Sequence, residues 1–347
     1  MKNLNNRNAI ESLGSRNKQI GYLYLRDAVS ADFIAKYICE NWNAGYIFEL
    51  NPGPGVLTKA ILSIGVPSLR VFEKNEEYLP ALKDLSDSHP NLEIIEQDFL
   101  YLPSIESKQS TDYIEVLDTF FKGIPEYSWD DRVPLRIFLI GSSKKSILFL
   151  RFLLAVLPHR TSIFSYGRCE FFVLLSELEY MKIKAEPKDS FANYRWSTVL
   201  YNLFFRVDCL KQFDHEICGP SPQQRNKKKN EDKFLYLVKL SPKPELFSSL
   251  VNGNRVPDIY FFIRHHLAKR SGLVIPTMEG WITSCGPRLI KEGMNVFTKF
   301  GDLSPKQLLA LFNQFSSWPE YENSVFHAAM QRFYGKGPLI EEEDELS

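Results

Sequence analysis

The sequence predicts an α/β fold, in which a doubly wound, mostly parallel sheet is followed by an all-helical C-terminal region. From Tyr46 to Phe99, short apolar runs alternate with stretches of helical spacing, which is the rhythm of strands and helices in such sheets. A turn with two glycines, Gly53 and Gly55, joins the first apolar run to the helix after it. From Pro257 to Phe333 the spacing is helical.

The elements of the first region follow from local patterns. Residues 28–41 carry apolar side chains on one helical face, after Ser30 or Asp32 as a cap. Residues 135–140 are apolar on both faces, as central parallel strands are. Residues 103–132 are polar and irregular, which is typical of a long excursion over a binding face. In chain order we expect helices at 28–41, 57–64, 78–85, 147–157 and 177–183, and strands at 46–50, 68–73, 91–97, 135–140, 169–175, 199–207 and 234–240. The last two strands should form an antiparallel pair at the sheet edge.

The run Ser-Pro-Lys-Pro at 241–244 predicts a domain boundary, and a chain of 347 residues with 44% hydrophobic content is long enough for two domains. We therefore expect a flexible or targeting segment at 1–20, a sheet domain at 21–243, a helical domain at 244–335 and an acidic tail at 336–347. Helices of the second domain are expected at 257–269, 277–284, 287–292, 305–318 and 322–333.

Composition excludes several classes of function. Lys plus Arg and Asp plus Glu number 42 each, so any nucleic-acid binding must come from local basic patches. The five cysteines are scattered and odd in number, which argues for a reducing compartment, and we expect no metal site. No Gly-x-Ser-x-Gly, His-Glu-x-x-His or Walker lysine motif is present, so hydrolase and metalloprotease chemistry is not expected.

Acidic residues and the glycine turn gather where three predicted strands end. The first strand contributes Glu49, Asn51, Gly53 and Gly55; the second ends in Glu73-Lys74 and the third in Asp98-Phe99. Ligands of open α/β sheets bind beyond the carboxyl ends of the strands, where a glycine turn lets a ligand approach the backbone.

The two acids suit an adenosyl ligand. Glu73 stands 18 residues after Gly55, at the spacing suited to ribose hydroxyls, and Asp98 can accept the adenine amino hydrogens with Phe99 beside the ring. Because a third glycine is missing, S-adenosylmethionine fits better than NAD. The alternative is that each acid is only a solvated residue at a strand end.

These residues resemble a known family, the ribosomal RNA adenine N6-dimethyltransferases. The resemblance covers roughly residues 20–335 and is carried by the segments Tyr22–Asp27, Glu49–Thr58, Phe72–Lys74, Gln97–Phe99 and Ser162–Arg168. It implies a Rossmann-like class I methyltransferase sheet with a small helical C-terminal domain, and nucleic acid held between the two. It further implies that Leu25, Glu73 and Asp98 contact S-adenosylmethionine.

Within the family the glycine segment looks most like the branch that serves as mitochondrial transcription factors. That branch implies mitochondrial RNA polymerase and promoter DNA as partners, with small-subunit ribosomal RNA as the other candidate, and the mitochondrial matrix (nucleoid) as the location. Residues 1–18 are basic with one acid, which is compatible with a matrix-targeting segment.

The sequence departs from the family at the catalytic position. The enzymes carry Asn-Leu-Pro-Tyr after the fourth strand, where the amide holds the adenine amino group and the aromatic ring stacks on the base. Here the segment contains Gly141, Ser142 and Ser143 instead. We expect adenine methylation to be weak or lost, and any S-adenosylmethionine binding to be vestigial.

Two basic patches, and the rim after the fourth predicted helix, are candidates for nucleic-acid contact. On the helix at 257–270 we expect Arg264, His266, Lys269 and Arg270 to lie exposed. The second patch is the loop with Lys227, Lys228 and Lys229, and the rim carries Tyr166 and Arg168. The alternatives are a solvated surface for the patches and simple packing for Tyr166.

Overall fold

The computed structural model describes residues 22–42, 45–106, 112–189, 193–220, 233–248 and 255–335. The predicted N-terminal segment at 1–20, the acidic tail at 336–347 and the basic loop with Lys227, Lys228 and Lys229 lie outside the described residues.

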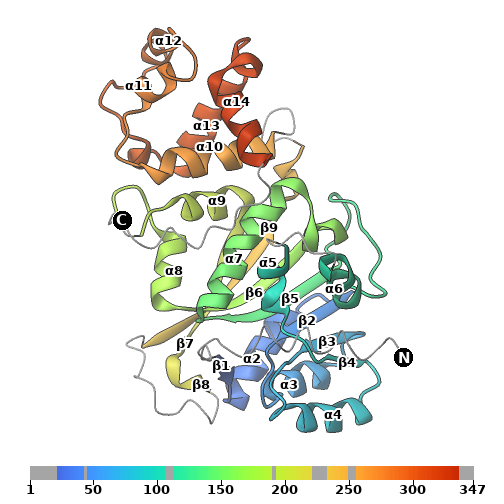
Figure 1. Ribbon diagram of the computed structural model, residues 1–347. Coiled ribbons are helices and arrows are strands. Elements are labelled where there is room, and N and C mark those ends of the chain that lie inside the picture. The colour runs from blue at the N-terminus through green and yellow to red at the C-terminus, as the bar shows by residue number, and fades with distance from the viewer. Residues whose placement is uncertain are drawn as a thin grey trace.

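A central, mostly parallel sheet confirms the predicted fold class (Figure 1). The strands are β1 (Leu23–Leu25), β2 (Tyr46–Leu50), β3 (Leu69–Phe72), β4 (Leu92–Ile95), β5 (Leu135–Gly141), β6 (Cys169–Ser176), β7 (Phe205–Asp214), β8 (Cys218–Pro220) and β9 (Phe234–Pro242). Seven of them form one sheet in the order β4-β3-β2-β5-β6-β9-β7, in which β9 runs antiparallel to both neighbours. Strands β1 and β8 pair separately. The strand order reverses between β2 and β5, which is the switch point where ligands of such sheets bind.

Helices cover both faces of the sheet. In this region they are α2 (Ala28–Cys39), α3 (Val56–Ile64), α4 (Leu79–Ser88), α5 (Leu102–Glu106), α6 (Asp112–Phe120), α7 (Lys144–Val156), α8 (Glu177–Lys184) and α9 (Trp196–Phe204). The apolar side chains of α2 and α3 share one core with one face of the sheet, and those of α7, α8 and α9 share another core with the opposite face. Strand β6 is buried along its whole length, as a strand covered on both faces must be.

The predicted cap of α2, Ser30 or Asp32, was wrong. Asp27 precedes the helix, and its side chain accepts a hydrogen bond from the Ser30 N–H at 2.7 Å.

Two further predictions for this region were wrong. Residues 199–207, predicted as a strand, are mostly the helix α9, and β7 begins only at Phe205. An apolar run without alternation does not distinguish a buried helix from a buried strand. The excursion at 103–132, predicted as irregular, contains most of α5 and all of α6.

The C-terminal region is helical, as predicted, and packs at one end of the sheet region (Figure 1). Its helices are α10 (Val256–Ala268), α11 (Val274–Glu279), α12 (Gly286–Lys291), α13 (Pro305–Ser316) and α14 (Val325–Tyr334). Helices α10 and α13 pack on α9, and one hydrophobic core runs from the sheet face into this region. Buried Tyr194 donates a hydrogen bond to the Leu303 carbonyl at 2.7 Å, which ties the two regions together.

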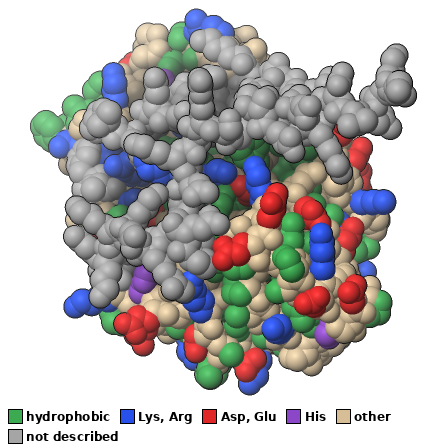
Figure 2. Space-filling view, turned by 60° about the horizontal axis from the view of Figure 1, so that its bottom comes forward, with side chains coloured by type: hydrophobic (Ala, Val, Ile, Leu, Met, Phe, Trp, Pro, Cys, Tyr) green, Lys and Arg blue, Asp and Glu red, His purple; other side chains and the backbone are tan. Residues whose placement is uncertain are grey.

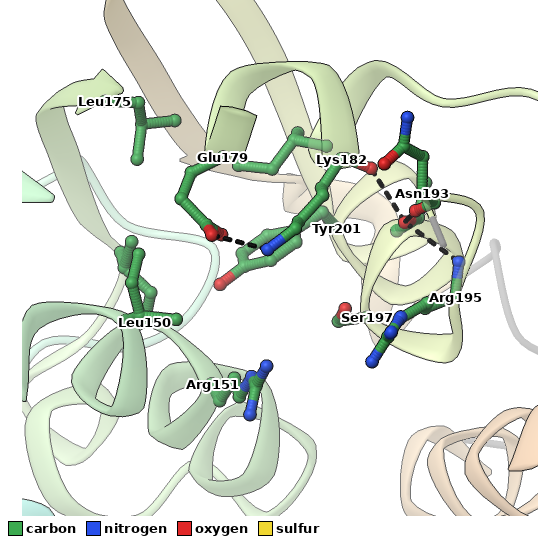
Figure 3. A pocket seen from close by; sticks show the side chains of 12 residues that line it. Leu150, Arg151, Leu175, Glu179, Lys182, Asn193, Arg195, Ser197 and Tyr201 are labelled. Carbon is green, nitrogen blue, oxygen red and sulfur yellow. Dashed lines mark hydrogen bonds and ion pairs between the residues drawn. The ribbon is translucent and has the colours of Figure 1, made fainter. Parts of the chain in front are cut away.

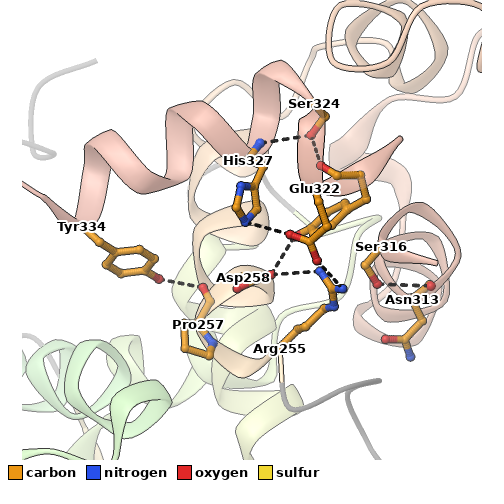
Figure 4. A network of polar contacts seen from close by, with 10 residues as sticks. Arg255, Pro257, Asp258, Asn313, Ser316, Glu322, Ser324, His327 and Tyr334 are labelled. Carbon is orange, nitrogen blue, oxygen red and sulfur yellow. Dashed lines mark hydrogen bonds and ion pairs between the residues drawn. The ribbon is translucent and has the colours of Figure 1, made fainter. Parts of the chain in front are cut away.

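A polar network joins the start of α10 to α14 (Figure 4). Arg255 pairs with Glu322 at 2.7 Å, and Tyr334 donates to the Pro257 carbonyl at 2.6 Å. Burial raises the pKa of Asp258, whose carboxylate accepts a hydrogen bond from Tyr321 at 2.8 Å. These contacts fix the C-terminal helix against the first helix of the region.

The described surface has mixed charge at the end of the molecule that carries α3 and α4. Figure 2 shows acidic and basic side chains interspersed there with apolar ones, in keeping with the zero net charge. Within the described ranges no helix is both long enough and apolar enough to cross a membrane.

Candidate cofactor and nucleic-acid sites

The glycine turn after β2 has the backbone conformation that its sequence predicts. Asn51, Gly53 and Gly55 have φ values of 53°, 58° and 74°, in the left-handed region that favours glycine and tolerates asparagine. A Cβ on Gly53 would overlap the ring of Tyr24. Gly55 is the residue before α3, so the N-terminal end of that helix points toward the turn.

Glu73 lies beside this turn, at the end of β3. Its side chain is 1% exposed and accepts hydrogen bonds from the backbone N–H of Gly53 at 3.0 Å and of Asn75 at 2.7 Å. Burial raises the pKa of Glu73, and these backbone N–H groups oppose the shift. The predicted approach of the acid to the glycine turn is therefore present.

Asp98, at the end of the third strand segment, is occupied by the chain's own donors. Its Oδ2 accepts from the Tyr22 hydroxyl at 2.8 Å and from Lys145 Nζ at 3.1 Å, and its Oδ1 accepts from the Leu100 N–H at 3.1 Å. Burial, together with the charge of Asp98, raises the pKa of Tyr22, so its hydroxyl stays a donor. Asp98 is thus neutralised by a cation from the start of α7.

Glu49 lies beneath the turn and not at a ligand surface. Its side chain is 2% exposed and accepts a hydrogen bond from the Thr58 hydroxyl, on the first turn of α3, at 2.7 Å. Burial raises the pKa of Glu49 to about 8. The arrangement links β2 to α3 across the glycine turn.

Three other predicted cofactor residues differ in their surroundings. Leu25 is buried in the core that α2 and α3 share with the sheet, and Lys74 is exposed. The prediction that the Phe99 ring lies beside a bound adenine was wrong. Phe99 is 1% exposed in a cluster of aromatic rings and stacks on Phe120 at 4.9 Å, because an apolar ring after a strand end turns into the core.

The donors and acceptors at this strand end are of the types that an adenosyl ligand needs, but they already contact other groups of the protein. Carboxylates such as Glu73 and Asp98 suit ribose hydroxyls and an adenine amino group. In this structure Asp98 Oδ2 already accepts from Tyr22 and Lys145, while Tyr24 packs against Gly53 and edge-on to Tyr78 at 4.8 Å. S-adenosylmethionine would be held by Glu73, Asp98 and the turn, and its adenine amino group would compete with Tyr22 and Lys145 for Asp98 Oδ2.

The segment that the resemblance places at the catalytic position forms a helix cap. Ser143 precedes α7, and its hydroxyl accepts from the Ser146 N–H at 3.1 Å, while Ser146 Oγ accepts from the Ser143 N–H at 3.0 Å. The Ser143 side chain is buried. A Cβ on Gly141 would come within 2.7 Å of the Leu175 side chain, so a larger residue there would require that side chain to shift. Ser142 is half-buried.

The predicted basic face of α10 is wrong for two of its four residues. His266 is 3% exposed and Arg270 is 7% exposed. His266 lies four residues after Phe262, so a helix places both on the core face. Arg270 follows one turn later and donates to the Tyr194 carbonyl. Lys269 is exposed, and half-buried Arg264 donates to the Tyr260 hydroxyl at 3.1 Å.

At the rim before β6, both predicted residues contact the protein itself. The ring of Tyr166 stacks on Phe121, with centroids 4.2 Å apart and planes 8° apart. Arg168 donates to the Asp131 carbonyl at 2.6 Å. Both side chains are half-buried, so packing accounts for their positions. A role in nucleic-acid binding stays a prediction.

Sequence reasoning missed Lys145 as a functional residue. It lies four residues after the end of β5 at the switch point, and this position is a signal that could have found it. Among the described residues, no group of three histidine, cysteine, aspartate or glutamate side chains is placed to hold a metal ion.

Comparisons with known proteins agree with this fold. Residues 14–132 match the family model described as ribosomal RNA adenine dimethylase. The Drosophila melanogaster protein named mitochondrial dimethyladenosine transferase 2 is 25% identical over 386 aligned residues, which cover 96% of this chain and 84% of that protein. The chain is thus similar to the ribosomal RNA adenine dimethylase family.

Further similarities are consistent with the family. The Bos taurus protein of the same name is 28% identical over 83% of this chain and 75% of its own length. Among solved structures, a dimethyladenosine transferase from Plasmodium falciparum has a TM-score of 0.56 at 16% identity and covers 84% of this chain and 97% of its own. The 23S ribosomal RNA methyltransferase ErmE has a TM-score of 0.55 at 14% identity, over 84% of this chain and 98% of its own. These two structures support the fold alone.

Proposed function

We propose that this chain is a mitochondrial transcription initiation factor that acts with mitochondrial RNA polymerase in promoter melting, on the fold of a ribosomal RNA adenine dimethyltransferase. The relatives that match most of its length are named mitochondrial, which supports a mitochondrial location. Its place there would be the matrix nucleoid.

The observation that carries the proposal is the helix cap formed by the segment that stands where the family's catalytic motif is expected. Transfer of a methyl group to an adenine amino group requires side chains that hold that amino group beside the cofactor. In this chain the hydroxyl of Ser143 is buried and engaged as the cap of α7. The Ser143 hydroxyl is therefore not available to hold the amino group of a target adenine.

The second support for the proposal is the ion pair that Asp98 forms. Asp98 is paired with Lys145 at 3.1 Å, and their side chains are 6% and 28% exposed. The acceptor that an adenosyl ring would use is therefore already satisfied. S-adenosylmethionine binding, if retained, would be a vestige of the ancestral reaction.

A run-off transcription assay tests the proposal. Purified mitochondrial RNA polymerase and linear promoter DNA would be combined with and without this protein. We expect promoter-specific transcripts only with the protein present, and unchanged transcription would contradict the proposal. The variant Asp98→Asn serves as a control, because a factor that acts without methyl transfer should keep its transcription activity.

An active dimethyltransferase of small-subunit ribosomal RNA is the second candidate. The convergence of Glu73 and Asp98 beside the glycine turn favours it. In that case S-adenosylmethionine would supply the methyl group, and Glu73 would hold the ribose. Methylation of an RNA hairpin with adjacent adenines should then occur with the wild-type protein and disappear in Glu73→Ala. Absence of methyl transfer by the wild-type protein would reject this candidate.

A further inference from the structure

A cavity of about 270 Å³ lies between α7, α8 and α9 (Figure 3). None of the residues proposed above for the cofactor or the catalytic position lines it. Its walls come from three helices and from the end of β6. The cavity therefore differs from the strand-end site and needs its own explanation.

Positive charge converges on this cavity. Arg151 on α7, Lys182 on α8 and Arg195 at the start of α9 all line it. The only lining carboxylate, Glu179, pairs with Lys182 at 2.6 Å. Within the described residues Arg151 has no ion-pair partner. The N-terminal end of α9 adds its partial positive charge on the same side.

The hydroxyl of a largely buried tyrosine faces the same space. The side chain of Tyr201 is 5% exposed, and in the described part of the chain its hydroxyl has no hydrogen-bond partner. Figure 3 shows this hydroxyl directed into the cavity, on the side of Glu179. Burial raises the pKa of Tyr201, and the charge of Arg151 opposes the shift, so the two groups lie close enough to interact. A ligand oxygen in the cavity would accept a hydrogen bond from this hydroxyl in place of solvent.

The remaining wall is apolar. Leu150 and Leu175 close the cavity beside Tyr201. A pocket with cations and a helix N-terminus on one side and aliphatic side chains on the other suits an anion that carries a less polar body. A nucleotide has this character, since its phosphate is charged and its base is a flat ring with faces that can pack on aliphatic side chains.

We propose that this cavity binds the phosphate ester of a single nucleotide. The phosphate lies between Arg151 and the N-terminus of α9, Tyr201 donates to a ligand oxygen, and the nucleoside packs on Leu150 and Leu175. The nucleotide is either free or part of a single strand, and only the second source rests on the nucleic-acid role proposed above.

Two probes distinguish these sources in the full-length protein. AMP is titrated by calorimetry, and a fluorescent single-stranded DNA of about 12 nucleotides is titrated by anisotropy, which is within the site sizes of single-strand binders. The variants are Arg151→Gln and Tyr201→Phe. Arg206→Gln is the matched control, because Arg206 is exposed on β7 and pairs with Asp208.

We expect the probe that binds to lose about tenfold in affinity in Arg151→Gln, and several-fold in Tyr201→Phe. With the oligonucleotide, the slope of log affinity against log salt should fall by about one in Arg151→Gln. Arg206→Gln should behave as wild type. AMP binding that depends on Arg151 assigns a free nucleotide, whereas oligonucleotide binding with the same dependence and no AMP binding assigns a strand.

Two outcomes overturn the proposal. One is affinity for both probes that is unchanged in Arg151→Gln and Tyr201→Phe. The other is the absence of saturable binding of either probe below about 1 mM. A thermal scan without ligand separates a structural role: removal of one of three like charges should leave the melting temperature unchanged or raised. A lowered melting temperature with unchanged affinity would make Arg151 a structural residue. A transcription assay that fails while these variants still lose affinity would reject the proposed function and leave the pocket standing.

Discussion

Lys145 Nζ lies 3.1 Å from Asp98 Oδ2, at the strand end where an adenosyl ligand is expected. The two residues are 47 positions apart in the sequence and meet because β4 and β5 end at the same edge of the sheet. The pair converts a ligand acceptor into an internal ion pair. Several measurable consequences depend on it and on its neighbours.

Replacement of Lys145 by alanine should increase the affinity for S-adenosylmethionine. Without the cation, Asp98 Oδ2 keeps only Tyr22 as a donor and regains capacity for the adenine amino group. We expect binding about three- to tenfold tighter by calorimetry, in the range of a partly buried ion pair. Lys144→Ala is the control, since Lys144 is exposed. If the affinity for S-adenosylmethionine stays the same or falls in Lys145→Ala, the Lys145–Asp98 ion pair does not hinder its binding.

Loss of the cap before α7 should destabilise the protein. Ser143→Ala removes the hydroxyl that accepts from the Ser146 N–H, which should lower the free energy of unfolding by about 1 kcal/mol. Urea denaturation of the two proteins measures the difference. The neighbouring change Ser142→Ala should have little effect, because the Ser142 side chain takes no part in the capping box. Equal stability of wild type and Ser143→Ala would argue against the cap.

Glu49 should make stability fall as the pH rises. Its pKa is raised to about 8 in the folded protein, from 4.5, so between these values the folded state binds the proton more strongly than the unfolded state. This contribution is complete below pH 4.5 and is lost as the pH rises toward 8. Relative to wild type, Glu49→Gln should gain up to about 1.4 kcal/mol per pH unit across that window.

Denaturant titrations of wild type and Glu49→Gln at several pH values between 5 and 8 test this sign. Glutamine can still accept a hydrogen bond from Thr58, so the variant removes the titratable carboxyl group but keeps the hydrogen bond. A stability difference that does not change with pH would mean that Glu49 titrates normally.

His266 should act in the opposite sense. Burial lowers its pKa to about 3, from 6.5, while its ring contacts the Phe262 carbonyl at 2.8 Å and accepts from Trp281 at 3.0 Å. The unfolded state then binds the proton more strongly, so this contribution is complete above pH 6.5 and is lost as the pH falls toward 3. Trp281 fluorescence during acid unfolding should report a lower midpoint pH in His266→Gln than in wild type, once both are corrected for stability at pH 7.

Lys269, unlike His266, should contribute to nucleic-acid binding. Lys269 is exposed directly after α10, so Lys269→Gln should weaken binding of any sequence and reduce the salt slope by about one. His266 is neutral and buried, so His266→Gln should leave that slope unchanged. Anisotropy titrations at several salt concentrations compare the two variants. Equal slopes for wild type and Lys269→Gln would remove α10 from the candidate nucleic-acid surface.

The sequence by itself determined the sheet, the glycine turn and the clustering of Glu73 with that turn. These follow from local rules: the alternation of apolar runs defines strands, parallel strands end at one edge, and only glycine or asparagine fits the left-handed turn. Residues 199–207 show the limit of such rules, because an apolar run that is buried as a helix looks like one that is buried as a strand.

Tertiary structure decided which donors reach each acid and which side chains reach solvent. Tyr22 and Lys145 contact Asp98 from 76 and 47 residues away, and no local pattern encodes a contact between side chains brought together only by strand order. Likewise His266 and Arg270 are charged or polar in sequence, yet they are buried because α10 must cover α9 and α13. A helix has one face for its core, and packing partners far along the chain select that face.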